Sequence, residues 1–182
     1  LTLDIGANQG FFTWYLAALG MKVHAFEIFE ENIIALQHGA EFNEKEVAKR
    51  VHLYPVGLGR DIGRMGMDGA NYLGHLQNSK AGPILASSFD CFAYHNIETL
   101  GNDLINNVAF VKLDVEGFEI AVLLGAKKSM FGPNGKVGGM LMEVGPSRWE
   151  RARVSFEMGV GEMKYVSTRF QNSYLIVRKC FF

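Results

Sequence analysis

The first twenty residues constrain the fold of this chain more than any other segment. An apolar run at residues 1–5 carries a carboxylate at Asp4 and leads into a turn with glycines at positions 6 and 10. Gly20 stands where a helix commonly ends in glycine. Apolar residues recur at helical spacing between the turn and Gly20: Phe11, Trp14, Tyr15, Ala18 and Leu19. This order predicts a β-strand, a ligand-binding glycine turn and an α-helix in direct succession.

The chemistry of this turn favours some ligands over others. Gly6 and Gly10 let the backbone approach a ligand closely, and the following helix offers free amide donors. Their G-x-x-x-G spacing lacks the middle glycine of the dinucleotide fingerprint and the Lys-Ser/Thr pair of a P-loop. Asp4 would repel a phosphate but would pair with an amino group. The turn therefore favours a cofactor with an amino-acid moiety over a pyrophosphate.

A second acidic residue supports a nucleoside-like cofactor. Residues 22–28 have the composition of a strand that ends near Glu27, 23 positions after Asp4. In a βαβ unit, an acid at this position accepts hydrogen bonds from ribose hydroxyls. Alternatively, Gly6 and Gly10 form an ordinary turn, and Asp4 and Glu27 are solvated strand ends. The order and spacing of all these features favour the cofactor hypothesis.

The rest of the chain continues an alternation of strands and helices. Helices are expected at residues 30–39 and 148–158, a helical turn at 44–50, and a further helix after Asp114 that carries Ile120, Leu123 and Leu124 at core spacing. Strands are expected at residues 51–56, 108–113 and 137–144, with a terminal hairpin at 164–170 and 173–179. This alternation predicts the α/β class with a single doubly wound, mostly parallel sheet of Rossmann-like form.

The segment at residues 57–79 differs from its surroundings because it is rich in glycine and methionine and follows neither helical nor strand periodicity. We interpret it as an insertion that forms a loop or a short hairpin. On the ligand side of a doubly wound sheet, such an insertion commonly builds substrate contacts. A connection without a function is an equally good interpretation.

Length and composition narrow the class of protein. A chain of 182 residues that is 48% hydrophobic is expected to form a single domain over residues 1–182. A net charge of −1 without a basic run argues against nucleic-acid partners. Cys91 and Cys180 have no metal-ligand spacing, which favours reduced thiols and a cytoplasmic location. No apolar stretch reaches the roughly 18–20 residues that span a bilayer. Because the chain opens inside a strand at Leu1, we expect an N-terminal truncation that could have removed a signal or an anchor.

Several motifs resemble those of one enzyme family. The segment Asp4-Ile5-Gly6-Ala7-Asn8-Gln9-Gly10, with Glu27 after it, resembles the first two motifs of class I S-adenosylmethionine-dependent methyltransferases. The segment from Lys112 to Glu119 is similar to the lysine-x-aspartate-x-glutamate-glycine-x-glutamate motif of the FkbM-type methyltransferases. Ser88-Phe89-Asp90 and Met142-Glu143-Val144 resemble two further elements of that family. The resemblance covers nearly the whole chain.

This resemblance implies S-adenosyl-L-methionine as the cofactor and an antiparallel strand added by the C-terminal hairpin. It also implies that the cofactor is bound by the first two motifs, through Asp4, Gly6, Ala7, Asn8, Gly10 and Glu27. The acid that often holds adenine after the third strand is missing, so backbone groups near Gly57 and the element that ends in Asp90 are the candidates for that contact.

The implied reaction is O-methylation of a hydroxyl on a sugar or secondary metabolite, so the partner is a small-molecule or glycan acceptor. A hydroxyl needs a general base, and the candidates by position are Asp114, Glu116 and Glu143, of which Asp114 and Glu116 are favoured. Asp114 could equally orient the cofactor. Alternatively, Glu116 and Glu119 only stabilise a helix dipole. No metal is expected: Asp114 and Glu143 offer two oxygens, but no Asp-Asn pair follows the fifth strand.

Two other functions remain open. A nicotinamide-dependent oxidoreductase could use the same sheet topology, although the missing middle glycine and Asp4 argue against it. A methyltransferase-like domain could also bind the cofactor or a partner without catalysis. The oligomeric state has no indicator in the sequence.

Overall fold

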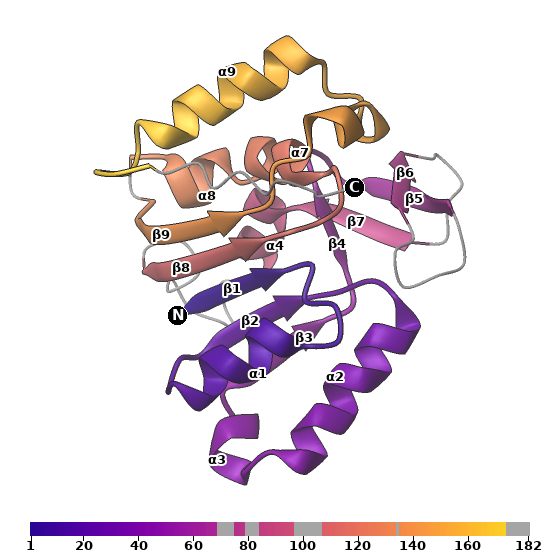
Figure 1. Cartoon of the computed structure of the whole chain (residues 1–182), viewed down its shortest axis with the longest axis vertical. Coiled ribbons are helices and arrows are strands. Elements are labelled where there is room, and N and C mark those ends of the chain that lie inside the picture. Colours follow the sequence, from indigo (N-terminus) through magenta and orange to yellow (C-terminus); the bar gives the residue numbers. More distant parts are fainter. Residues whose placement is uncertain (69–74, 79–83, 97–106, 134, 174–182) are drawn as a thin grey trace, which may run out of the picture.

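Five parallel strands form the central sheet of the computed structural model, which describes residues 1–68, 75–78, 84–96, 107–133 and 135–173 (Figure 1). The strand order is β3-β2-β1-β8-β9. The strands are β1 (Thr2–Ile5), β2 (Val23–Phe26), β3 (Val51–Tyr54), β8 (Val108–Leu113) and β9 (Val137–Met142). The chain thus runs outward from β1 to β3 and then continues on the other side of β1. This reversal confirms the predicted doubly wound α/β fold.

The register of this sheet brings its carboxyl ends together. Ile5 is paired with Phe26 on one side and with Leu113 on the other. Phe26 is paired with Tyr54, and Leu113 with Met142. All five strands therefore end at one edge, and the residues that follow them are close in space.

Helices cover both faces of the sheet, in two groups that lie on opposite sides in Figure 1. One group is α1 (Phe11–Ala18), α2 (Glu30–Phe42) and α3 (Lys45–Ala48). The other is α4 (Phe89–His95), α7 (Glu119–Gly125), α8 (Lys127–Phe131), the 3₁₀ helix η1 (Pro146–Ala152) and α9 (Phe156–Ser167). Of the helices that the structure describes, none is long and apolar enough to cross a membrane.

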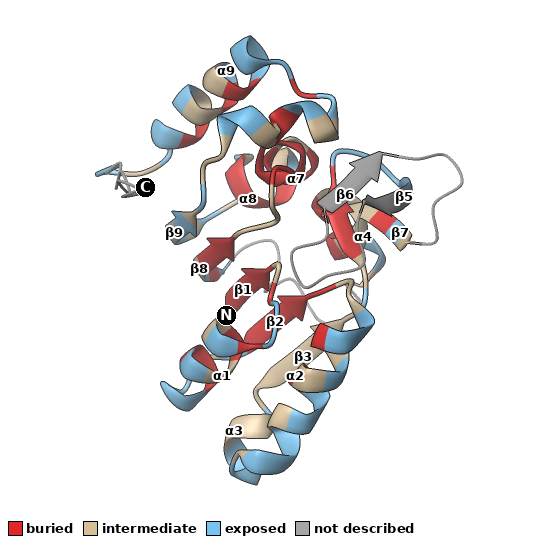
Figure 2. Ribbon diagram, turned by 45° about the vertical axis from the view of Figure 1, so that its right-hand side comes forward, coloured by how far each residue is buried: buried red, intermediate tan, exposed pale blue. Residues whose placement is uncertain are grey.

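The alternation of side chains along β1 divides the hydrophobic core between the two faces. Leu3 and Ile5 belong to the main cluster, which also contains Ile120 and Leu123 of α7. A smaller cluster joins Leu16 and Ala17 of α1 to Val23 of β2. Figure 2 shows that buried residues dominate β1, β2, β8 and α7, as expected for a parallel sheet covered on both faces.

A second, four-stranded sheet has the order β4-β7-β5-β6. Its strands are β4 (Gly57–Gly59), β5 (Gly63–Asp68), β6 (His75–Asn78) and β7 (Ile84–Ser88). Strand β4 is parallel to β7, whereas β5 is antiparallel to both β6 and β7. The segment 57–79 therefore contains antiparallel pairing and matches the hairpin interpretation more closely than the loop.

The C-terminal region differs from the predicted pattern in two places. The single helix predicted at residues 148–158 is divided into η1 and α9, because Arg153 has a φ of 55° and Ser155 begins α9 by accepting a hydrogen bond from the Met158 amide. The strand predicted at residues 164–170 is wrong, because α9 continues to Ser167. The second predicted strand, 173–179, lies almost entirely outside the described residues. Helical spacing of Val160, Met163 and Val166 against the core explains the difference.

A buried histidine on β2 gives the fold a pH dependence. His24 is 1% exposed, its ring stacks on His52 at a centroid distance of 4.8 Å, and its Nδ1 lies 2.8 Å from the Tyr54 hydroxyl. Burial lowers the pKa of His24 to about 3, so the folded protein holds a neutral ring at neutral pH.

We predict that acidification destabilises the protein partly through this residue. Below about pH 6.5 the unfolded chain protonates His24 while the folded chain does not, so stability is lost as the pH falls toward 3. At pH 5 the loss reaches up to about 2 kcal/mol, less where solvent screens the ring. Urea unfolding of the parent and His24→Phe at pH 7.5 and 5 measures it. The loss of unfolding free energy between pH 7.5 and pH 5 should be smaller in His24→Phe than in the parent. It should be unchanged in the exposed control His38→Gln. Equal pH dependence in all three proteins would contradict the prediction.

Candidate functional site

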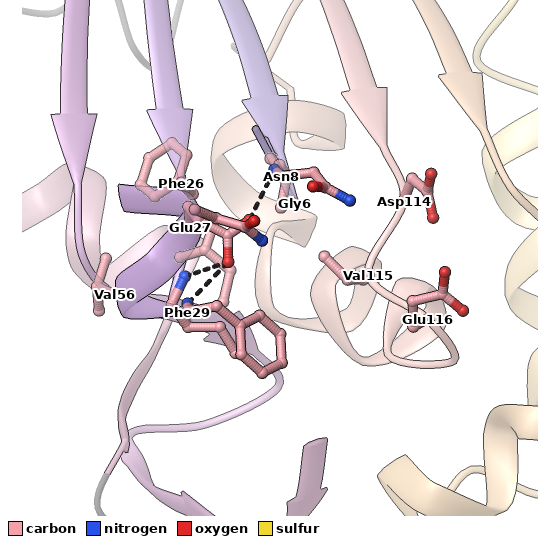
Figure 3. A pocket seen from close by; sticks show the side chains of 14 residues that line it. Gly6, Asn8, Phe26, Glu27, Phe29, Val56, Asp114, Val115 and Glu116 are labelled. Carbon is pink, nitrogen blue, oxygen red and sulfur yellow. Dashed lines mark hydrogen bonds between the residues drawn. The ribbon is translucent and has the colours of Figure 1, made fainter. Parts of the chain in front are cut away.

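A pocket lies at the edge where the strands of the central sheet end (Figure 3). Its cavity volume is about 90 Å³, and it is lined mainly by segments that follow β1, β2, β3 and β8. Figure 3 shows Glu27 on one side of the pocket and Asp114 and Glu116 on the other. The topology therefore produces one cavity with two chemically distinct sides.

Glu27 is fixed by backbone donors at the end of β2. Its Oε1 accepts hydrogen bonds from the amides of Ile28 and Phe29 at 2.7 and 2.9 Å. Its Oε2 accepts one from the amide of Asn8 at 2.6 Å. The side chain is largely buried and lines the pocket, and Oε2 keeps a lone pair for a ligand hydroxyl. The turn after β1 and the end of β2 are thus joined through the side chain of Glu27.

Gly6 is required by the close approach of two backbone segments. Its φ is 80°, in the left-handed region that favours glycine. A Cβ at this position would overlap the carbonyl oxygen of Asp114. The turn after β1 and the segment after β8 therefore pack directly against each other.

Asp4 does not line the pocket. As an even-numbered residue of β1 it points toward α1, where its Oδ2 accepts a hydrogen bond from the Thr13 hydroxyl at 2.6 Å. Burial raises the pKa of this carboxyl, although the positive charge of Lys112 acts to lower it. The predicted pairing of Asp4 with the amino group of a ligand thus has no counterpart here, since the side chain is fully buried.

Lys112 of β8 connects the turn to the acidic side of the pocket. Its Nζ donates a hydrogen bond to the Gly6 carbonyl at 2.5 Å and lies 3.6 Å from Asp4 Oδ1. The same Nζ lies 3.9 Å from Asp114 Oδ2. In the sequence, Lys112 stands out only as a lysine within an apolar strand, and such a lysine is rarely buried unless it is paired.

Three carboxylates converge beside this lysine. Asp114, Glu119 and Glu143 each offer one oxygen, and these oxygens lie within 4.8 Å of one another. Glu119 Oε1 accepts hydrogen bonds from the amides of Val115 and Gly117 at 3.1 and 2.9 Å. Burial raises the pKa of Glu119 and, together with the charge of Asp114, that of Glu143. Glu119 therefore shapes the loop before α7 as well as beginning that helix.

Arg148 of η1 holds the outer side of this group. Its guanidinium forms an ion pair with the carboxylate of Glu116 and another with Glu143 Oε2, the latter at 2.9 Å. Glu116 has a φ of 55°, and Gly117, with a φ of 109°, has no room for a Cβ because of Arg148. Sequence reasoning missed Arg148, since nothing near it in the chain marks it as a partner of residue 116.

The remaining predicted site residues are divided between the pocket and other places. Asp90 lies outside the lining and accepts hydrogen bonds from the amides of Lys128 and Ser129 at 3.0 and 2.8 Å, which fixes the start of α8. Ala7 and Gly10 also lie outside the lining. The structure brings together Gly6, Asn8, Glu27, Gly57, Asp114 and Glu116, and adds residues that the sequence did not mark, among them Phe26, Ile28, Phe29, Asn32 and Val115.

Comparisons with known proteins are consistent with this geometry. Residues 4–157 match the sequence model of a family described as the Methyltransferase FkbM domain. The methyltransferase FkbM from Methylobacillus flagellatus KT has a similar structure, with a TM-score of 0.56 and 17% identity over 92% of this chain and 36% of that one. This chain therefore spans only about a third of the length of that protein.

Two further solved structures are less similar to this chain. They are a precorrin-6y C5,15-methyltransferase from Geobacter metallireducens GS-15 (TM-score 0.45, 12% identity, 92% of this chain and 61% of that one) and the glycopeptide N-methyltransferase MtfA complexed with S-adenosyl-L-homocysteine (0.42, 14%, 78% and 41%). No curated protein matches the sequence.

The contact at Gly6 leads to a prediction on stability. Gly6→Ala should be more destabilising than Gly20→Ala, although both glycines have a positive φ, because a Cβ at position 20 meets open space. The left-handed backbone costs about 1–2 kcal/mol in either variant. The overlap with Asp114 should add about 1–3 kcal/mol in Gly6→Ala alone. Chemical denaturation of both variants measures the difference, and equal free energies of unfolding would show that the two segments are not in contact.

Proposed function

The chain belongs to the FkbM methyltransferase family, and from that premise we propose that it is an S-adenosyl-L-methionine-dependent O-methyltransferase. The acceptor in this proposal is a hydroxyl on a small molecule or glycan, such as a sugar or a secondary metabolite. The observation that carries the proposal is Glu27, a largely buried carboxylate held by three backbone amides beside the Gly6 turn.

The donor set of the pocket fits such a cofactor. Glu27 Oε2 has a free lone pair for a ribose hydroxyl. The segment around Gly57 offers backbone groups beside Val56 and Leu58, whose apolar side chains suit a flat purine ring. Because Asp4 is fully buried toward α1, its carboxylate is not available to the ammonium of the amino-acid tail. When bound, the cofactor supplies a methyl group that is already activated on a sulfonium.

The chain itself has to hold the acceptor and receive its proton. Positioning of two reactants contributes roughly 7–11 kcal/mol to lowering a barrier, and a general base about a hundred- to ten-thousandfold in rate. Of the two favoured bases, Asp114 fits better because the carboxylate of Glu116 is paired with Arg148. In the proposed reaction the hydroxyl proton passes to the Asp114 carboxylate, and Glu116 positions Arg148 at the rim.

We predict that S-adenosyl-L-homocysteine binds the protein and that Glu27→Gln weakens this binding. A charge-assisted hydrogen bond contributes about 1.5–3 kcal/mol, so the dissociation constant should rise about ten- to a hundredfold. Isothermal titration calorimetry measures it, with circular dichroism to verify folding. Glu31→Gln, an exposed change on α2, is the matched control and should bind as the parent does.

The same titrations separate the alternative functions. No binding of S-adenosyl-L-homocysteine by a folded protein would overturn the proposal, and binding of NADH in its place would favour the oxidoreductase. A non-catalytic domain would be favoured if S-adenosyl-L-homocysteine binds but no hydroxyl acceptor is methylated. In that case Asp114→Asn should behave as the parent does in every measurement.

A further inference from the structure

The convergence of Asp114, Glu119 and Glu143 has a consequence beyond the binding of a cofactor. The three residues lie at the end of β8, the start of α7 and directly after β9. One oxygen of each lies within 4.8 Å of the others. A single hard cation with oxygen ligands at about 2.0–2.6 Å can bridge separations of this size.

Two oxygens in this group are buried without a partner. Glu119 is 1% exposed, and while its Oε1 accepts two backbone hydrogen bonds, its Oε2 has no hydrogen-bond partner among the residues that the structure describes. Asp114 Oδ1 is also buried and has no hydrogen-bond partner among the described residues. A buried carboxylate oxygen left unpaired is costly, and either a bound cation or a proton shared between the carboxyls would remove that cost.

The two neighbouring cationic side chains are each shared between this cluster and an acid outside it. Lys112 donates to the Gly6 carbonyl and lies nearer to Asp4 than to Asp114. Arg148 is paired with Glu116 and with Oε2 of Glu143. Neither cation is therefore paired with Glu119, and the cluster keeps an excess of negative charge.

We propose that Asp114, Glu119 and Glu143 bind a hard divalent cation of the Mg²⁺ or Mn²⁺ type at the rim of the pocket. Carboxylate oxygens are the ligands that these ions prefer, and Mg²⁺ keeps several waters, so three protein ligands leave coordination positions open. The Asp114 oxygen without a partner is the one available to the ion, which leaves Oδ2 toward Lys112.

The expectation of no metal rested on the missing Asp-Asn pair after the fifth strand, with Asp114 and Glu143 as the two oxygen donors considered. Glu119 supplies the third because positive φ angles at Glu116 and Gly117 turn the chain back before α7. An open coordination position would hold the acceptor hydroxyl beside the cofactor; this role alone rests on the proposed function.

Mn²⁺ titration of the full chain, followed by electron paramagnetic resonance without cofactor, tests the site. We expect one saturable Mn²⁺ that is displaced by Mg²⁺. Glu143→Gln and Glu119→Gln should each raise the dissociation constant at least tenfold. In Glu119→Gln the amide oxygen can still accept the bonds from Val115 and Gly117, so the loop is kept. The exposed control Glu41→Gln should bind as the parent does.

The outcomes are distinct from those of the cofactor titration. The proposal is overturned if no saturable Mn²⁺ binds, which would leave a shared proton between the carboxyls, or if Glu143→Gln and Glu119→Gln bind Mn²⁺ as the parent does. Mn²⁺ binding together with no binding of S-adenosyl-L-homocysteine would uphold the cation site and reject the methyltransferase proposal. Binding of S-adenosyl-L-homocysteine without saturable Mn²⁺ binding would reject the cation site and leave the methyltransferase proposal standing.

Discussion

The buried ammonium of Lys112 is the interaction on which the arrangement of the site depends. It bonds to the Gly6 carbonyl and lies close to the carboxylates of Asp4 and Asp114. One positive charge thus lies close to Asp4 of β1 and to Asp114 after β8, and it joins the turn after β1 to the segment after β8. A buried lysine is tolerated only with such partners, so the sheet and the site are stabilised by the same contacts.

The two sides of the pocket follow from this arrangement. Backbone amides fix Glu27 on one side, where no charged partner is needed. On the other side, the loop between β8 and α7 gathers acidic side chains, and Arg148 ties two of them to η1. The site is therefore built from neutral dipoles on the side of Glu27 and from ionic contacts on its acidic side.

The sequence predicts the parts of this structure that depend on local patterns. The predicted strand at residues 108–113 matches β8, and Glu27 and Gly6 both line the pocket, because strand composition and turn spacing are local properties. The sequence does not predict that Asp4 points toward α1 or that Asp90 caps α8. Both depend on which helix packs against each side chain in the folded chain. The strand at residues 164–170 was predicted as half of a terminal hairpin, and packing of α9 on the core decides against it. Arg148 could be found only through a contact between segments distant in the chain.

The absence of a side chain at Gly6 also limits how this pocket can vary. Because the turn after β1 touches the backbone at Asp114, the separation between the two sides of the pocket is set by van der Waals contact and not by adjustable side chains. A side chain at position 6 could not be accommodated without moving β1 away from β8. Variation in the shape of the pocket would therefore have to occur in segments outside this contact, such as η1 and the second sheet.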